Sequence, residues 1–385
     1  MKIVAAGGGS GGHVTPVLAV INELNKHDPA LQVHFICDKG FLKQSKDIMS
    51  RAAVPVMVSY IMAGKWRRYH GIPFLKQFFY WPTLSGNVKD FFTLGIGFLQ
   101  SVGLLLRNRP DVVFTKGGFV CVPVGLAAAI LRIPLVIHDS DAHPGLTNRI
   151  LSRYARFIAT GAPLKFYSYP KARSYYVGIP ISSAYMPTSE AQRRKIKHSL
   201  GLVEDRSLVA VTGGGGGALP INKAVSEGAK AITKMAQVVH LTGLHKAEAV
   251  AKSVGKNDHY HVYEFVDQTK MAQIICAADV VVTRAGASTL LELAAAAKAT
   301  IIVPNPRLTN GHQLKNAAVY KLANAAIVLN DDDIQAHHEH LTEAIMLLLN
   351  DNRQRAQLEK NIHILAKPHA AEDVAKLLMR AHEKQ

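Results

Sequence analysis

The feature of this sequence that most constrains its fold is a glycine-rich loop near the start of the chain. The apolar run Lys2–Ala6 leads directly into Gly7-Gly8-Gly9-Ser10-Gly11-Gly12-His13, and a helical pattern begins at Val14. Glycine permits a tight turn and the close approach of a phosphate or sugar, and the helix that follows offers free N–H groups. The spacing G-x-G-x-x-G between a strand and a helix predicts a Rossmann-like nucleotide-binding unit.

Short apolar runs alternate with helical patterns in the first half of the chain, and the same alternation begins again in the second half. In the first half we expect strands at Lys2–Ala6, Val33–Cys37, Pro55–Ser59, Asp111–Thr115, Pro134–His138 and Arg156–Thr160. In the second half we expect them at Leu208–Thr212, Val238–Leu241, His261–Phe265, Val280–Thr283, Thr300–Val303 and Ala326–Leu329. The pattern predicts an α/β protein with two doubly wound domains, and the cleft between them is the default site.

The predicted boundaries follow changes in composition. The first domain covers 1–165, and 166–182 is a linker in a stretch rich in proline and tyrosine. The second domain covers 183–367, and a last helix at about 368–385 is expected to pack back on the first domain. A chain of 385 residues is long enough for both domains to bury their own cores.

Cysteine content and hydropathy narrow the class of protein. The three cysteines are far apart, so they indicate neither a disulfide framework nor a zinc site, and a reducing compartment is expected. No signal peptide is evident. The apolar stretch Phe91–Leu106 is short for a membrane span, and we expect much of it to form a buried helix.

The formal charge of +17 favours anionic partners. From Lys65 to Trp81 cations are mixed with aromatic side chains, and the apolar stretch follows. This mixture is typical of a protein that binds an anionic membrane surface and a lipid-linked substrate. Single-stranded nucleic acid is the competing partner, but the basic run is short and contains no known binding module, so no nucleic-acid partner is expected.

The first glycine loop alone is compatible with a dinucleotide-dependent oxidoreductase, since Asp38 ends the second strand where such proteins hold the ribose. Further glycines follow other strands, at Gly117-Gly118 and Gly213–Gly217. One dinucleotide does not need glycine loops in both domains. A donor and an acceptor that each carry phosphates could use them, although Gly117-Gly118 could equally be a simple tight turn.

Two segments of the second half have the chemistry of a nucleotide-sugar site. After the strand Val280–Thr283, Ala287 begins a helix whose N–H groups and Ser288 and Thr289 hydroxyls can bind phosphate, with Glu292 able to bind ribose hydroxyls. Alternatively, Glu292 lies near position N3 or N4 of a capped helix and only stabilises the helix dipole. In the next loop Gln313 suits sugar hydroxyls, and ordinary surface polarity would explain it as well.

Taken together, these segments resemble the MurG family of glycosyltransferases, within glycosyltransferase family 28. The segments that carry the resemblance are Gly7–Pro16, Lys116–Phe119, His138–Asp141, Gly145–Asn148, Gly213–Ala218 with Asn222, Arg284–Glu292, and His312-Gln313 with Asn316-Ala317. The resemblance implies a GT-B fold and an inverting, metal-independent transfer of N-acetylglucosamine from its UDP donor. The acceptor would be undecaprenyl-pyrophosphoryl-N-acetylmuramoyl-peptide (lipid I), the product lipid II, and the enzyme peripheral on the cytoplasmic face of the membrane, with no cofactor.

The resemblance also implies roles for particular residues. Ser10, Gly11 and Gly12 would contact the donor sugar or its phosphates. Ala287, Ser288, Thr289 and Glu292 would hold the diphosphate and ribose, Gln313 the sugar or ribose, and the backbone near Leu244 the uracil. The sequence departs from the family at three donor or acceptor positions: Asp141 replaces the usual Asn, Gly215-Gly216 the usual Ser-Gln, and Ser182 the usual Arg.

Inverting transfer needs a base for the acceptor hydroxyl. His13 is the candidate, because the ordinary pKa of histidine lies near neutrality, and Asp141 is the reserve. His13 could instead hydrogen-bond a phosphate. Two other functions stay open: a GT-B transferase with another nucleotide sugar or glycolipid acceptor, and a nucleotide-sugar-binding protein without catalysis.

Overall fold

The computed structural model describes residues 1–8, 11–64, 81–307 and 311–383. The chain divides into two compact units. The first contains Met1–Ile181 and Lys367–Gln385, and the second contains Ser182–Ala366. Ser10 and the predicted basic and aromatic residues at 65–80 lie outside the described residues.

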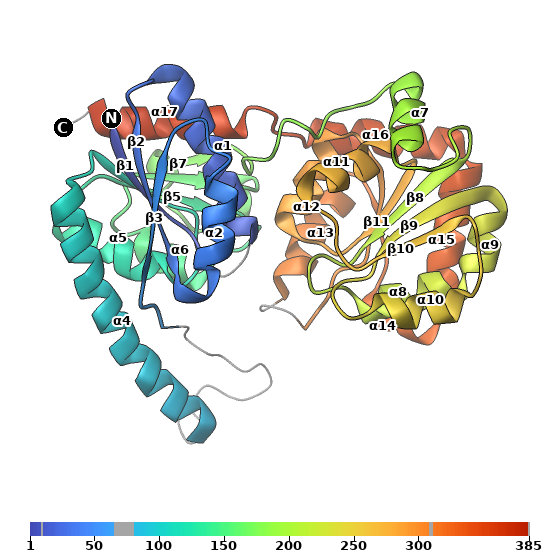
Figure 1. Ribbon diagram of the computed structural model, residues 1–385, viewed down its shortest axis with the longest axis horizontal. Coiled ribbons are helices and arrows are strands. Elements are labelled where there is room, and N and C mark those ends of the chain that lie inside the picture. Colours follow the sequence, from blue (N-terminus) through green and yellow to red (C-terminus); the bar gives the residue numbers. More distant parts are fainter. Residues whose placement is uncertain (9–10, 65–80, 308–310, 384–385) are drawn as a thin grey trace. The chain divides into compact units, whose positions relative to one another are not determined.

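The first unit is a parallel sheet with helices on both faces (Figure 1). The strand order is β3-β2-β1-β4-β5-β6-β7. The strands are β1 (Lys2–Ala6), β2 (Gln32–Asp38), β3 (Val56–Ile61), β4 (Val112–Thr115), β5 (Leu135–Asp139), β6 (Phe157–Thr160) and β7 (Ser174–Tyr176). The helices are α1 (Gly11–His27), α2 (Leu42–Met49), α4 (Trp81–Asn108), α5 (Cys121–Ile130), α6 (Leu146–Leu151) and α17 (Ala370–Glu383), with short 3₁₀ turns at Lys39–Phe41, Leu164–Phe166 and Lys171–Arg173.

Alternate residues of each strand enter two different cores. In β1, Ile3 and Ala5 pack with side chains of α1 and α17, whereas Val4 and Ala6 pack with side chains of α4 and α5. This alternation follows from the two-residue period of a strand. Because both faces are covered by helices, the strands are apolar throughout rather than alternately polar.

The last helix, α17, belongs to the first unit. It packs against α1, and Val374, Leu377 and Leu378 are buried in the core on that face of the sheet. The spacing of these residues places them on one side of the helix. The chain therefore completes the first unit with its own C-terminal segment.

The second unit has the strand order β10-β9-β8-β11-β12-β13, all parallel. Its strands are β8 (Ser207–Thr212), β9 (Ala236–Leu241), β10 (Tyr260–Tyr263), β11 (Val280–Thr283), β12 (Ala299–Ile302) and β13 (Ile327–Val328). Its helices are α7 (Glu190–Ser199), α8 (Leu219–Glu227), α9 (Ala229–Met235), α10 (Ala247–Val254), α11 (Gln268–Ala277), α12 (Ala287–Ala295), α13 (His312–Leu322), α14 (Asp331–Ala336), α15 (Glu339–Asn350) and α16 (Asn352–Ile364).

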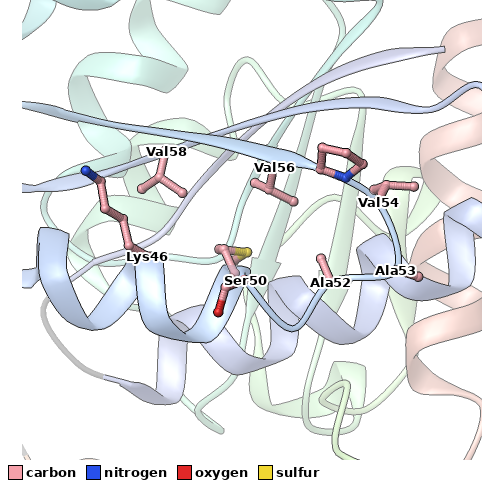
Figure 2. Close-up of a pocket in the computed structure, with 9 residues that line it drawn as sticks. Lys46, Ser50, Ala52, Ala53, Val54, Val56 and Val58 are labelled. Atoms are coloured by element: carbon pink, nitrogen blue, oxygen red, sulfur yellow. The ribbon is translucent and has the colours of Figure 1, made fainter.

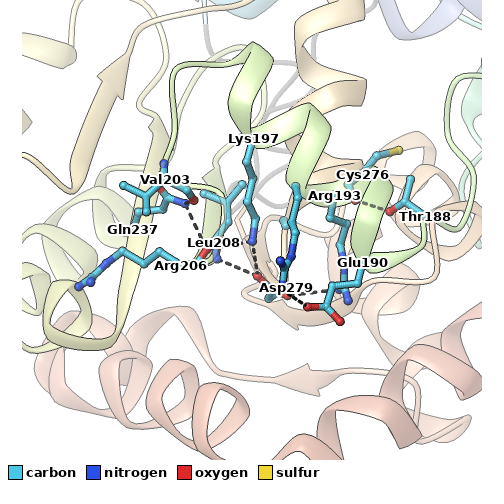
Figure 3. Close-up of polar contacts among 12 residues, drawn as sticks. Thr188, Glu190, Arg193, Lys197, Val203, Arg206, Leu208, Gln237, Cys276 and Asp279 are labelled. Atoms are coloured by element: carbon cyan, nitrogen blue, oxygen red, sulfur yellow. Dashed lines mark hydrogen bonds and ion pairs between the residues drawn. The ribbon is translucent and has the colours of Figure 1, made fainter.

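A buried ionic cluster fixes α7 to the amino ends of the strands in the second unit (Figure 3). Asp279 accepts hydrogen bonds from Leu208 N at 2.8 Å, from Arg193 at 3.2 Å and from Lys197 Nζ at 3.4 Å. Lys197 also donates to the carbonyl oxygen of Arg206 at 2.9 Å. Since loops at the carboxyl ends of the strands usually bind ligands, this cluster at the opposite ends is a structural anchor.

The stretch predicted as a partly buried helix lies in α4, and the expectation holds for one of its faces. Ser101 and Leu105 are buried, but Phe92, Leu99 and Leu106 are more than half exposed. In the described part of the chain, no helix combines the length and apolar character needed to cross a bilayer.

Candidate functional site

In the first unit, three loops meet at the carboxyl ends of adjacent strands. The strand β1 lies between β2 and β4. The chain adds β2 and β3 on one side of β1 and then β4 to β7 on the other side, so the order in which strands are added reverses beside β1. Such a switch point is the usual ligand site of a doubly wound sheet. Gly7 and Gly8 follow β1, and Gly11, Gly12 and His13 begin α1. Lys116–Gly118 follow β4, and Ser140 and Asp141 follow β5.

The glycine loops after β1 and β4 contact each other through their backbones. A Cβ atom on Gly118 would lie 2.6 Å from the carbonyl oxygen of Gly8, and Gly118 has a φ of +92°. A side chain at Gly118 is therefore excluded both by space and by conformation. Gly118 is more than a tight turn, because it allows the two loops to touch.

His13 lies in the first turn of α1, and its imidazole packs beside Gly117. A Cβ atom on Gly117 would lie 3.8 Å from Cε1 and 3.9 Å from Nδ1 of His13. This Nδ1 is buried and has no hydrogen-bond partner among the described residues. Burial and the nearby Lys116 cation lower the pKa of His13 to about 4, and the Asp141 carboxylate opposes them. The imidazole is thus neutral at pH 7 and has a nitrogen that can accept a proton, but a pKa of about 4 makes it a weaker base than the near-neutral histidine expected from the sequence.

The loop after β5 is held by buried hydrogen bonds. The Tyr169 hydroxyl donates to Asp139 Oδ2 at 2.7 Å, and the Tyr167 hydroxyl donates to the carbonyl oxygen of Asp141 at 2.6 Å. Burial raises the pKa of Asp139 to about 7. The structure therefore brings the two predicted bases, His13 and Asp141, into one site, with Gly11 and Gly12 at the start of the helix that carries His13.

In the second unit, a cavity of about 170 Å³ opens at the carboxyl ends of the strands. Three predicted donor residues line it: Gly215 after β8, and Thr289 and Glu292 of α12. Burial raises the pKa of Glu292 to about 7. The carboxyl group is therefore close to half ionised at neutral pH, and its environment favours the neutral form until a partner is present.

The position of Glu292 in α12 excludes a capping role. The helix begins at Ala287, so Glu292 lies beyond its first turn, and the N-cap is Gly286. No side chain caps this helix in the part of the chain that the structure describes. The interpretation of Glu292 as a residue near N3 or N4 is therefore wrong. The first N–H groups of α12, next to Ser288, are available for a phosphate.

The loops around Leu244 and Gln313 are tied to this end of the sheet but lie outside the lining of the cavity. Leu244 is 54% exposed, in the loop after β9. Lys246 Nζ donates to the carbonyl oxygen of Gly216 at 2.9 Å and so joins that loop to the glycine loop after β8. Gln313 accepts a hydrogen bond from Asn305 N at 2.8 Å.

Two further positions, Asn316 and Ser182, come from the resemblance to the family. Asn316 in α13 donates to the carbonyl oxygen of Ala285 at 3.0 Å, which places the helix of Gln313 beside the loop that precedes α12. Ser182, where the family usually has Arg, accepts a hydrogen bond from Ala184 N at 3.2 Å. A serine hydroxyl bonded within its own turn supplies none of the positive charge of an arginine.

Sequence reasoning missed one wall of the cavity. Phe265, Val266 and Met271 line it together with Glu264, although the sequence placed the uracil near Leu244. Glu264, Phe265 and Val266 directly follow β10, which ends at Tyr263 instead of Phe265 as predicted, and Met271 lies in α11 (Gln268–Ala277). Their position after a strand of the sheet was the available signal, since all loops at this edge converge.

A second hollow, of about 510 Å³, lies between α2 and the edge strand β3 of the first unit (Figure 2). Its lining is mostly alanine and valine, and Lys46 is the one charged lining residue. Catalytic and ligand sites need several convergent polar groups, which this hollow lacks. Among the described residues, no group of three His, Cys, Asp or Glu side chains is placed to hold a metal ion.

Comparison with known families assigns both units to one family of glycosyltransferases. The glycosyltransferase family 28 N-terminal domain matches residues 3–160, and the C-terminal domain of the same family matches residues 208–378. A protein of Halalkalibacterium halodurans is 34% identical over 382 residues, which are 98% of this chain and 99% of that protein. It is named UDP-N-acetylglucosamine–N-acetylmuramyl-(pentapeptide) pyrophosphoryl-undecaprenol N-acetylglucosamine transferase. A Bacillus cereus protein of the same name, numbered 1, is 32% identical and covers 100% of this chain and 99% of its own.

Solved structures of the same fold confirm the predicted fold class. Acinetobacter baumannii MurG superposes with a TM-score of 0.70 at 22% identity, over 98% of this chain and 99% of that one. The UDP-N-acetylglucosamine 2-epimerase of Neisseria meningitidis, solved with UDP-N-acetylglucosamine, has a TM-score of 0.67 at 13% identity over 99% and 100% of the chains. Both units of this chain are thus of the kind found in GT-B enzymes.

Proposed function

This chain belongs to glycosyltransferase family 28, and we propose that it transfers N-acetylglucosamine from UDP-N-acetylglucosamine to lipid I, forming lipid II for peptidoglycan. The observation that carries the proposal is that the residues lining the second-unit cavity and the names of the most similar relatives indicate the same reaction. The cavity lined by Gly215, Thr289 and Glu292 offers polar groups suited to the ribose and phosphate of a nucleotide. Relatives alike over nearly the whole chain are named for this transfer.

In the proposed reaction, the second unit binds the donor. The N–H groups at the start of α12 stabilise the diphosphate, and the Glu292 carboxylate accepts hydrogen bonds from the ribose. In the first unit, His13 takes the proton of the acceptor hydroxyl as its oxygen forms a bond to C1 of the sugar. The bond from C1 to the diphosphate breaks and UDP leaves, so the configuration at C1 is inverted.

Transfer of labelled sugar from UDP-N-acetylglucosamine to a lipid I analogue tests this proposal directly. We expect product to form at a rate that depends on both substrates. The UDP conjugates of glucose and N-acetylgalactosamine serve as competing donors in the same assay. Absence of transfer by protein that is folded and binds UDP would overturn the proposal.

A different donor or glycolipid acceptor is the second candidate, and the environment of Ser182 favours it. The hydroxyl of Ser182 bonds Ala184 and carries no charge, where the family usually has an arginine. If another UDP-sugar is used at least tenfold more efficiently than UDP-N-acetylglucosamine, this candidate replaces the first.

We also propose that α4 binds the cytoplasmic membrane surface peripherally. Phe92, Ile96, Leu99 and Leu106 are 67%, 49%, 70% and 56% exposed, and their spacing places them on one face of the helix. The opposite face packs on α5. An exposed apolar stripe on a protein with a formal charge of +17 suits an interface with anionic lipids.

Leu99→Glu is expected to weaken binding to vesicles that contain anionic phospholipid about tenfold, because the change removes an apolar contact and adds a repelled charge. Vesicle co-sedimentation measures this. Leu322→Glu is the matched control, since Leu322 is 73% exposed on α13 of the second unit. Equal loss of binding in both variants, or in neither, would contradict the assignment to α4.

A further inference from the structure

Lys116 is a buried lysine at the edge of the proposed acceptor site. It directly follows β4, and only 1% of its surface is exposed, although lysine is rarely buried in proteins. Its backbone N–H donates to the carbonyl oxygen of Ala6 at 3.0 Å, and its ammonium group donates to the Ser140 hydroxyl. The side chain thus connects the loop after β4 with the loop after β5.

Charged and titratable groups surround this ammonium from each neighbouring element. The carboxylates of Asp139 and Asp141, in and after β5, favour its charged form. The Cys121 thiol of α5 is buried, which raises its pKa to about 12, so it stays protonated. His13 of α1 is near enough for the Lys116 charge to lower its pKa.

His138 of β5 is the remaining titratable neighbour. Burial and the Lys116 charge hold its pKa well below the usual range, so this ring is neutral. Burial also lowers the pKa of Lys116 itself, to about 8, which leaves most of the ammonium charged at pH 7. One cation is therefore held among neutral imidazoles and two carboxyl groups.

Two simpler roles fit this geometry poorly. A lysine that binds the acceptor pyrophosphate must reach solvent, and at 1% exposure this ammonium does not. A purely structural strut would gain nothing from a charge, because burying an ammonium is unfavourable and methionine fills a similar volume. What remains is an effect of the charge on the groups beside it.

We propose that Lys116 is a positioning residue of the acceptor site, which joins the loops after β4 and β5 and places one positive charge beside both His13 and Asp141. The inference rests on the proposed function, because it gives Lys116 a part in the same transfer. Beside the effect of burial, the charge lowers the pKa of His13 and so further stabilises the neutral imidazole.

The titration of His13, followed by NMR of histidine labelled at Cε1, tests the inference without any substrate. The His13 signal is assigned by its loss in His13→Gln. We expect Lys116→Met to raise the midpoint of His13 by about one pH unit, and Lys116→Arg to leave it near the wild-type value. Lys43→Met, at an exposed lysine of α2, is the matched control and should change nothing. A wild-type midpoint in Lys116→Met, or equal shifts in the Met and Arg variants, would overturn the inference.

Ser140→Ala keeps the test decisive if Lys116→Met does not fold. It removes the hydroxyl that accepts from the ammonium and introduces no new bulk. We expect the His13 midpoint to rise in the same direction. A midpoint equal to that of the wild type would disprove the coupling. If the wild-type protein transfers no sugar, the proposed function fails, yet the NMR titration still decides the role of Lys116.

Discussion

His13→Gln is expected to lower kcat for sugar transfer about 10³-fold at pH 7, the range that removal of a general base produces. Glutamine keeps a hydrogen-bonding group of similar size but cannot accept the proton. The affinity for UDP-N-acetylglucosamine should stay within about twofold of the wild type, because the proposed donor residues Thr289 and Glu292 are in the second unit. Steady-state kinetics with both substrates varied, together with calorimetry for the donor, measure the two quantities.

The division between kcat and KM separates the base from its alternative. If His13 only hydrogen-bonds a phosphate of the acceptor, glutamine would replace it in part, and the KM for the acceptor would rise while kcat changed little. That outcome would contradict the assignment of His13 as the base.

The pH dependence gives a second check, with Asp141→Asn as its control. The neutral imidazole is the active form, so kcat/KM for the acceptor should be level from pH 8 to about 5 and fall as the pH approaches the His13 pKa of about 4. The Asp141 carboxylate raises the pKa of His13, so Asp141→Asn should move this fall to still lower pH. A loss of kcat in Asp141→Asn as large as in His13→Gln would make Asp141 the base.

The sequence allowed both candidate sites to be located, for a reason that is geometric. All strands of a doubly wound sheet are parallel, so residues that directly follow different strands share one edge. The proximity of His13 and Asp141, which come from α1 and from the loop after β5, follows from this rule. The same rule places Gly215 with Thr289 and Glu292.

Features that depend on side-chain packing were beyond sequence reasoning. No periodicity in the loop after β4 indicates that Lys116 is buried and bonded to Ser140. The cavity wall at Phe265 and Val266 depends on β10 ending at Tyr263, and the ends of strands are the least certain part of such predictions. Exposure on α4 was underestimated, because an apolar stretch of helix does not reveal which face a neighbour covers.

Glu292→Gln is expected to stabilise the ligand-free protein at pH 8. The folded state raises the pKa of Glu292 from 4.5 to about 7, so the folded state binds this proton more tightly than the unfolded state does. Between pH 4.5 and 7 the free energy of unfolding therefore falls as pH rises, and above pH 7 the loss is complete. Glutamine has no charge to bury and so avoids this loss. We expect Glu292→Gln to raise the free energy of unfolding by about 2 kcal/mol at pH 8 and by almost nothing at pH 4.5. Thermal unfolding at the two pH values measures it.

The same substitution should weaken donor binding about thirtyfold at pH 8, because an ionised acceptor of the ribose hydroxyls is replaced by a neutral one. In the wild type, the affinity for UDP-N-acetylglucosamine should rise from pH 6 to pH 8 as Glu292 ionises, and this rise should vanish in the variant. Glu248→Gln, at an exposed residue of α10, should alter neither stability nor affinity. If the Glu292 carboxylate only packed against its neighbours, the substitution would change stability alone. If Glu292→Gln raises the stability of the free protein and weakens donor binding, Glu292 is retained for binding although it destabilises the ligand-free protein. If donor affinity is unchanged in Glu292→Gln, Glu292 is not part of the donor site.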